Sequence, residues 1–321
     1  MRRRRVLAAL GGLSINCPTV ASAAWPERPI TLVVPFAPGG IADLTARTIA
    51  EAMAVRLGTA IVVDNRPSAG SVVASTAVAK AAPDGHTLLL MSNANAVSTG
   101  LFRKLPFDVV KDFAPITTLG FFDLGVFVTD ASPLRTLADV VDQAKKNPGR
   151  LTIGTIAVGS SQHLAAELFK TKAGIDALIV PYKGTPAVLT ALRAGEIDLA
   201  FEILGPMLAQ VGAKVVRTLA VTSDRRAAAL PDVPTVAQAG VPGYVVASWN
   251  ALAAPVGTPP AVIERLHAAA TEALAQPAVR QRLQELGVRA EAGSPKQLEA
   301  LLASEIKRWG DVIRAAKIEP E

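Results

Sequence analysis

Short apolar runs alternate with amphipathic stretches along most of the chain. Residues 30–36 form an apolar run typical of a buried strand, and residues 41–57 follow with apolar side chains at helical spacing. The same order returns further along, where "LTIGTI" predicts a strand and "HLAAELFKTKAG" predicts a helix that ends at a glycine. Apolar strands that alternate with helices are typical of parallel sheets covered on both faces. The pattern therefore predicts an α/β fold.

The predicted strands fall into two groups, which indicates two lobes, each a mostly parallel sheet flanked by helices. Long extended stretches near residues 123–130 and 243–250 are expected to cross between the groups. After the second crossing the pattern is largely helical. We therefore expect lobe 1 to contain residues 25–125 and 247–321, and lobe 2 to contain residues 126–246.

The first 24 residues have the pattern of a cleaved signal peptide. Four arginines (Arg2–Arg5) precede an apolar segment, and small residues follow at Ala21–Ala24, so cleavage is expected near Ala23 or Ala24. The apolar segment is about half as long as the roughly 20 residues that a membrane-spanning helix requires. Residues 1–24 therefore predict export to the periplasm, by the general or the twin-arginine route.

Composition and charge exclude several other classes of protein. The pI is about 9.6, but removal of the four N-terminal arginines lowers the formal net charge from +6 to +2, which does not favour nucleic-acid binding. The single cysteine, Cys17, lies in the predicted signal, so the mature chain has no thiolate for a metal site. The glycine motifs of nucleotide and dinucleotide sites are absent, and no histidine–carboxylate metal spacing stands out. We expect no cofactor and no metal.

Two glycine-rich loops follow predicted strands and precede predicted helices. They are "FAPGG", before Ile41, and "AVGSSQ", before His163. Ligands of parallel sheets bind at the carboxyl ends of strands, where helix N-termini present unpaired N–H groups to a small anion. Glycine at such joins also occurs for steric reasons alone. We expect the backbone at Gly39–Gly40 and Gly159–Ser161, not a buried arginine, to hold a ligand carboxylate, with glycine at 40 allowing close approach.

The chain also carries a series of motifs in a fixed order. "PFAPGGIADLTAR", "VVDNRPSAG", "PDGHTLLL" and "KDFAPITTLG" are followed by "VGSSQHLAAELF", "IVPYKGTPAVLTALRAGEIDL", "RTLAVTSDRR", "LPDVPTVAQAG" and "APVGTPP". Over residues 25–313 this series resembles the Bug family, the solute receptors of tripartite tricarboxylate transporters. The chain departs from the family pattern at Ser68–Ser71, where the family often has "GAGG".

The resemblance implies a two-lobed periplasmic binding protein (Venus flytrap, type II) that closes on a small organic acid and is not an enzyme. The loops at residues 36–40 and 157–163 would grip one carboxylate through backbone N–H groups, hydroxyls and ordered water. The partner would be the membrane permease of the transporter, and we expect the receptor to be a monomer. A sensor subunit that presents the bound solute to a signalling partner would use the same binding chemistry.

Ligand contacts are expected from crevice-facing strand ends and helix starts. Several of these residues have a structural alternative: Asp43 suits a helix first turn, Asn93 and Asn95 suit turns, and His163 suits a bond to local backbone. Glu202 would repel an acid unless it is paired. The expected ligand-binding residues are Phe36, Pro38, Gly39, Gly40, Asp43, Asn93, Asn95, Val158, Gly159, Ser160, Ser161, His163, Tyr182, Gly184, Thr185 and Glu202.

A serine hydrolase is the remaining alternative, because Ser160 and Ser161 lie near His163 in the sequence. The nucleophile motif G-x-S-x-G is absent, and adjacent residues at one helix start seldom face each other. We therefore expect binding and no catalytic residues.

Overall fold

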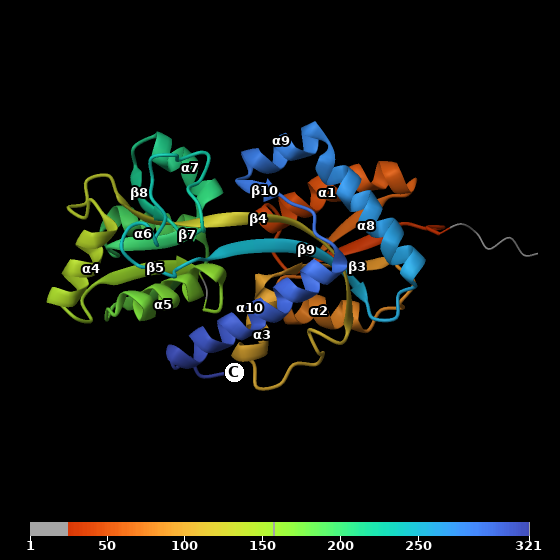
Figure 1. Ribbon diagram of the computed structural model, residues 1–321, viewed down its shortest axis with the longest axis horizontal. Coiled ribbons are helices and arrows are strands. Elements are labelled where there is room, and N and C mark those ends of the chain that lie inside the picture. Colours follow the sequence, from red (N-terminus) through yellow and green to blue (C-terminus); the bar gives the residue numbers. More distant parts are fainter. Residues whose placement is uncertain (1–24, 157, 321) are drawn as a thin grey trace, which may run out of the picture.

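The computed structural model describes residues 25–156 and 158–320 (Figure 1). The predicted signal peptide, residues 1–24, lies outside the described residues. The strands are β1 (Ile30–Val34), β2 (Ile61–Asn65), β3 (Thr87–Ser92), β4 (Phe113–Thr129), β5 (Thr152–Ile156), β6 (Leu178–Tyr182), β7 (Leu199–Ile203), β8 (Val216–Val221), β9 (Ala247–Pro255) and β10 (Val288–Ala290).

Several helices begin at residues that satisfy their first N–H groups. Ser92, Thr136 and Ser294 each cap the helix that follows and form a capping box with its third residue. The helices are α1 (Ile41–Leu57), α2 (Val72–Ala79), α3 (Asn93–Leu101), α4 (Leu137–Lys146), α5 (Ser161–Ala173), α6 (Thr185–Ala194), α7 (Leu204–Gly212), α8 (Pro260–Ala275), α9 (Pro277–Glu285) and α10 (Pro295–Ala315), with a short 3-10 helix, η1 (Ala69–Ser71).

One long strand, β4, joins the two halves of the molecule. Its first part, up to Asp123, pairs with β9 and β10, whereas the part from Leu124 onward pairs with β7 and β8. The main path of the sheet has the order β2-β1-β3-β9-β4-β7-β5-β6. The pairs β1–β2, β1–β3, β5–β6 and β5–β7 are parallel, as expected for each lobe, and the strands that cross between the lobes are antiparallel.

The strand β9 makes the second crossing beside β4. Ala247 pairs with Asp123, and the N–H of Val246 donates to Thr222 in the other half. The bonding partners of both strands thus change next to the predicted boundaries at 125/126 and 246/247. These boundaries stay predictions, and we use lobe 1 and lobe 2 for the two halves that they define.

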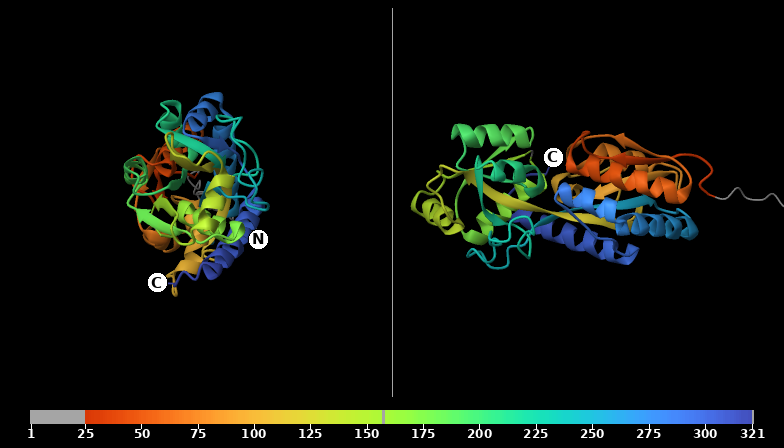
Figure 2. Two further views of the ribbon diagram at one scale, coloured as in Figure 1. Left: turned by 90° about the vertical axis from the view of Figure 1, so that its left-hand side faces the viewer. Right: turned by 90° about the horizontal axis from the view of Figure 1, so that it is seen from above.

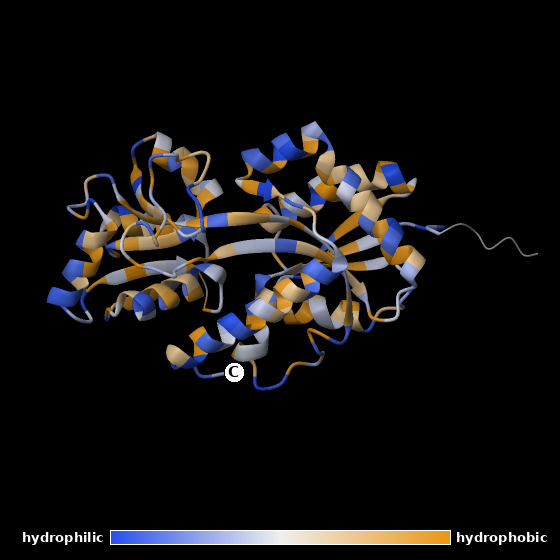
Figure 3. Ribbon diagram, viewed as in Figure 1, coloured by the Kyte–Doolittle hydropathy of each residue, from blue (hydrophilic) through white to orange (hydrophobic). Residues whose placement is uncertain are grey.

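Helices cover both faces of the sheet (Figures 1 and 2). On one face α1, α8 and α9 pack on lobe 1 and α6 and α7 pack on lobe 2, while α2, α3, α4, α5 and α10 cover the opposite face. Polar residues gather on the outer turns, as on α9 (Figure 3). Burial of apolar surface stabilises such layers by about 25 cal/mol per Å².

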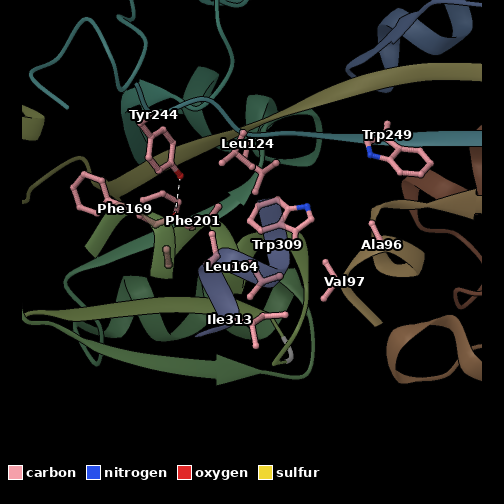
Figure 4. Packing of buried hydrophobic residues seen from close by; sticks show 14 of the residues in the cluster. Ala96, Val97, Leu124, Leu164, Phe169, Phe201, Tyr244, Trp249, Trp309 and Ile313 are labelled. Atoms are coloured by element: carbon pink, nitrogen blue, oxygen red, sulfur yellow. Dashed lines mark hydrogen bonds between the residues drawn. The ribbon is translucent and has the colours of Figure 1, made fainter. Parts of the chain in front are cut away.

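The apolar cluster on the α10 face extends through both lobes. It contains Met91 and Val97 from lobe 1, and Leu164 and Phe169 from lobe 2. The fully buried Trp309 of α10 lies between the two groups (Figure 4). On this face the lobes therefore share one core.

Ser71, in the segment that departs from the family pattern, has a left-handed backbone. Its φ is 61°, which costs a residue with a Cβ about 1 kcal/mol relative to glycine. Its hydroxyl is buried and has no partner among the described residues. We expect Ser71→Gly to raise the free energy of unfolding by about 1 kcal/mol, measured by urea denaturation.

Ser68→Gly is the matched control for this change. Ser68 has an extended backbone, and its Oγ accepts the N–H of Val73 at 2.9 Å. Glycine at this position should therefore lower the free energy of unfolding. A loss of stability in Ser71→Gly as well would contradict the assignment of strain to residue 71.

Candidate ligand-binding site

The carboxylate of Asp43 fixes the loop between β1 and α1. Asp43 is buried, and its Oδ2 accepts the N–H of Gly39 at 2.8 Å. Arg47 Nε and Asn65 Nδ2 donate to the same carboxylate at 3.0 and 2.9 Å. Burial alone would raise the pKa of Asp43, but these hydrogen bonds outweigh it and hold the pKa below its ordinary value. Asp43, in the first turn of α1, thus acts as an ionised anchor of the loop, and its expected contact with a ligand stays a prediction.

Gly39 and Gly40 have different roles from those we expected. The N–H of Gly39 is taken by Asp43, and it is Gly39, with a φ of 84°, that has the backbone favouring glycine. Gly40 has a φ of −80°, and a Cβ there would meet only a carbonyl oxygen at 3.8 Å. The start of α1 has no side-chain cap, so the N–H groups of Ile41 and Ala42 lack helical partners. The N–H of Gly40 and those of the first turn of α1 are therefore the donors left for an anion.

The other two predicted residues of this loop differ in exposure. Phe36 is half-buried and packs on the apolar cluster beneath α1, and its carbonyl accepts Asn65 Nδ2 at 3.0 Å. Pro38 is exposed at the tip of the loop. Phe36 therefore supports the loop from below, and Pro38 borders its open side.

The loop before α5 has a similar construction. Gly159 has a φ of 79°, and Ser160 caps α5 by accepting the N–H of His163 at 3.1 Å. The N–H of Gly159 donates to His163 Nδ1 at 3.4 Å. Burial, with a contribution from the charge of Lys170, lowers the pKa of His163 to about 4, so the ring is neutral at pH 7 and carries its proton on Nε2. Val158 is exposed at the tip of this loop.

Hydrogen bonds across the lobes bring the starts of α3 and α5 together. Asn93 Nδ2 donates to Ser161 Oγ at 3.1 Å, and the same oxygen lies 3.1 Å from the Oγ of Ser248 on β9. Trp309 Nε1 donates to Asn93 Oδ1 at 2.6 Å and to Glu305 Oε2 at 2.8 Å. Two predicted ligand residues, Asn93 and Ser161, are thus bonded to each other, and their contact with a ligand stays a prediction.

Glycines allow the lobes to touch on both faces of the sheet. A Cβ on Gly159 would lie 2.2 Å from a methyl carbon of Leu101 on α3. On the other face, Gly205 of α7 abuts the turn after α9, where a Cβ on Gly287 would lie 2.7 Å from the Cα of Gly205. Substitution of these glycines would therefore push the lobes apart.

Asn95 does not reach the crevice, contrary to our expectation. It is fully buried, its Nδ2 donates to Ser75 Oγ at 2.8 Å, and its Oδ1 accepts the N–H of Ser92 at 2.9 Å. The amide thus completes the capping box of α3 and ties this helix to α2. Asn95 is thus neither a crevice residue nor a turn residue, because it lies in the first turn of α3.

The first turns of α5 and α6 donate hydrogen bonds to the carboxylate of Glu202. Thr185 Oγ1 donates to Glu202 Oε2 at 2.9 Å, and Gln162 Nε2 donates to the same oxygen at 3.3 Å. Glu202 Oε1 is buried and has no partner among the described residues. Burial raises the pKa of Glu202, although these hydrogen bonds oppose the shift. Gly184 is the N-cap of α6, and the half-buried Tyr182 packs on the cluster beneath α6 and α7.

The site buries carboxylates but no lysine or arginine side chain among the described residues. Asp43, Glu202 and Glu305 are buried, whereas no lysine or arginine of residues 25–156 and 158–320 is. The starts of α1, α3, α5 and α6 each follow the carboxyl end of a strand, and helix N-termini carry partial positive charge. An anion in the crevice would therefore depend on backbone and hydroxyl donors.

Two polar residues of β9, Ser248 and Asn250, were missed by the sequence reasoning. They interrupt the otherwise apolar run "VVASWNALAAP" at alternate positions, so both lie on one face of the strand. That spacing was the available signal, because a polar side chain in a buried strand needs a partner.

The described part of the chain has neither a metal-binding cluster nor a membrane-spanning helix. In it, no three or more His, Cys, Asp or Glu side chains are grouped so that they could hold a metal ion. Of the helices described, none is long and apolar enough to cross a membrane.

Comparison with known proteins identifies the family. Residues 45–318 match the family described as "Tripartite tricarboxylate transporter family receptor". The chain belongs to this receptor family. It is similar to protein BugT of Bordetella pertussis, with 34% identity over 98% of this chain and 98% of BugT. The resemblance to Bug receptors is thereby confirmed.

Solved receptors of the same kind share the fold. The structure of R. palustris Rpa4515 with adipate is 35% identical, has a TM-score of 0.83, and matches 92% of this chain and 100% of that one. MatC (Rpa3494) from Rhodopseudomonas palustris with bound malate is 34% identical with a TM-score of 0.79, over 90% of this chain and 100% of that one. These likenesses confirm the two-lobed α/β fold of a solute-binding protein.

Glu202 makes the stability of the receptor depend on pH. The pKa of Glu202 is raised in the folded state. Ionisation of its carboxyl at neutral pH therefore costs more free energy in the folded state than in the unfolded state, and it lowers the stability. Glu202→Gln keeps an acceptor for Thr185 and removes the charge, so we expect a higher unfolding midpoint at pH 7. The gain should shrink as the pH falls and vanish below about pH 4, where the carboxyl is protonated in both states.

Thermal unfolding of both proteins between pH 3.5 and pH 8 measures this difference. Glu196→Gln serves as the control, because Glu196 is an exposed glutamate of lobe 2. A gain in Glu202→Gln that is the same at every pH would contradict a raised pKa.

Proposed function

We propose that this receptor captures a small organic acid between its lobes and does not convert it. The observation that carries the proposal is the pair of loops described above, the uncapped start of α1 in lobe 1 and the start of α5 at Ser160–Ser161 in lobe 2. Both offer hydrogen-bond donors to an anion, and no lysine or arginine is buried among the described residues to compete for that role. The two related structures that hold adipate and malate support a carboxylate as the ligand.

The hydrogen bonds of the two serines favour binding over catalysis. Ser160 Oγ accepts the backbone N–H of His163, and the imidazole Nδ1 accepts the N–H of Gly159. Ser161 Oγ is bonded to side chains of lobe 1. A serine nucleophile needs its hydroxyl bonded to a base, and the described contacts give neither serine such a bond.

The receptor is further proposed to work in the periplasm and to deliver its ligand to the membrane permease of a tripartite tricarboxylate transporter. The pattern of residues 1–24 supports export, and membership of the receptor family supports the permease as partner. We expect a monomer, because a single chain supplies both loops.

A thermal-shift screen of the mature chain against acetate, succinate, malate, adipate and nicotinate tests the proposed ligand class. An acid that binds only the folded state raises the unfolding midpoint, and a hundredfold excess over Kd stabilises by about 2.7 kcal/mol. At least one of these acids should produce a saturable shift. If a folded preparation shows no shift with any of them, the proposal is overturned.

Gly40→Ala separates ligand binding from folding. The backbone of Gly40 suits any residue and a Cβ there would make only an ordinary contact with a carbonyl oxygen at 3.8 Å, so the midpoint of the free protein should not change. The methyl group would stand at the uncapped start of α1, so we expect the affinity for the identified acid to fall at least about tenfold, roughly 1.4 kcal/mol, in calorimetry.

Gly39→Ala is the companion variant, and unlike Gly40→Ala it should lower the stability of the free protein. Its positive φ should cost the free protein about 1 kcal/mol of stability. Unchanged affinity in Gly40→Ala would mean that the ligand does not approach the start of α1.

A further inference from the structure

Asn250 is a buried amide that the fold leaves unpaired. It lies in the middle of the sheet, between Ser92 of β3 and Gly120 of β4. Its side chain is fully buried, and neither Oδ1 nor Nδ2 has a hydrogen-bond partner among the described residues. An unpaired buried amide destabilises a protein, and asparagine is a poor strand former. The fold alone therefore gives no reason for this side chain.

The position of Asn250 links it to the crevice. On β9 the alternate residues Leu252 and Ala254 belong to the apolar cluster beneath α1, so Ser248 and Asn250 lie on the same face of the strand. Ser248, two residues from Asn250, contacts Ser161 at the start of α5. Asn250 thus lies on β9 between Leu252, which belongs to the apolar cluster beneath α1, and Ser248, which contacts lobe 2.

Lobe 2 also contains an unpaired buried acceptor. Ile203, at the end of β7, packs on the apolar cluster beneath α1. Glu202 precedes Ile203, and its Oε1 is buried without a partner among the described residues. Unpaired buried oxygen acceptors therefore lie in both lobes.

We propose that Asn250 binds a hydroxyl or carboxamide group on the ligand, so that the receptor prefers hydroxylated or amidated carboxylic acids to plain ones. This inference rests on the proposed function. A hydroxyl can donate to Oδ1 and accept from Nδ2 at once, and a carboxamide pairs with an asparagine amide in the same way. A second ionised carboxylate would satisfy only Nδ2 and would leave Oδ1 unpaired.

Matched pairs of acids test the preference. Calorimetry compares malate with succinate and 3-hydroxybutyrate with butyrate, because each pair differs by one hydroxyl. The receptor should bind the hydroxylated member of at least one pair about tenfold or more tightly, the loss expected when a buried polar group is left without its partner. Asn250→Leu should abolish this ratio and keep the affinity for the plain acid.

The stability of the free protein gives an independent readout. Asn250→Leu removes an unpaired amide from an apolar surrounding, so the unfolding midpoint should rise. Asn95→Leu is the matched control, because Asn95 is equally buried but has both amide atoms bonded. Its midpoint should fall. If leucine disturbs the sheet, Asn250→Ala can be used to compare the affinities for hydroxylated and plain acids, because alanine is smaller than asparagine.

The outcomes separate the two proposals. If no acid binds the unmodified receptor, the proposed function and this inference both fail. If plain and hydroxylated acids bind equally, or the ratio survives in Asn250→Leu and Asn250→Ala, only the inference fails. A midpoint that falls in Asn250→Leu as it does in Asn95→Leu would assign Asn250 to the fold and would also overturn the inference.

Discussion

The backbone hydrogen bonding of β4 is the constraint on which the rest of the structure depends. This strand exchanges its partners between Asp123 and Leu124, so one continuous segment belongs to the sheets of both lobes. Together with β9 it fixes which strand ends face each other across the crossing (Figure 1). The helix starts that carry the candidate site are placed by those strand ends, and the shared core around Trp309 adds apolar contact on one face.

Within that frame each of the two candidate loops is held by a residue of the helix that it precedes. Asp43 takes the N–H of Gly39, and His163 takes the N–H of Gly159, so each loop is folded back on its own helix. A site that is ordered before the ligand arrives loses less conformational entropy on binding. Two short local contacts therefore prepare the backbone donors of two lobes that are distant in sequence.

The sequence predicted the features that depend on neighbouring residues. The period of the apolar positions placed the strands and helices, and glycine at residues 39 and 159 marked the loops, because these signals are local. The capping of α3 by Asn95, the bond from Trp309 to Asn93 and the unpaired Asn250 could not be read in this way. They depend on which residues the sheet brings together, and Trp309 and Asn93 are 216 positions apart.

The glycine-to-glycine contact between α7 and the turn after α9 governs how closely the two lobes approach on this face. Gly205 and Gly287 meet through backbone atoms, and a Cβ on either glycine would lie within 3 Å of the other segment. Ile203 and Leu286, beside this contact, pack on the apolar cluster beneath α1. The close approach of the lobes therefore depends on keeping these two positions free of side chains, while apolar neighbours supply the packing.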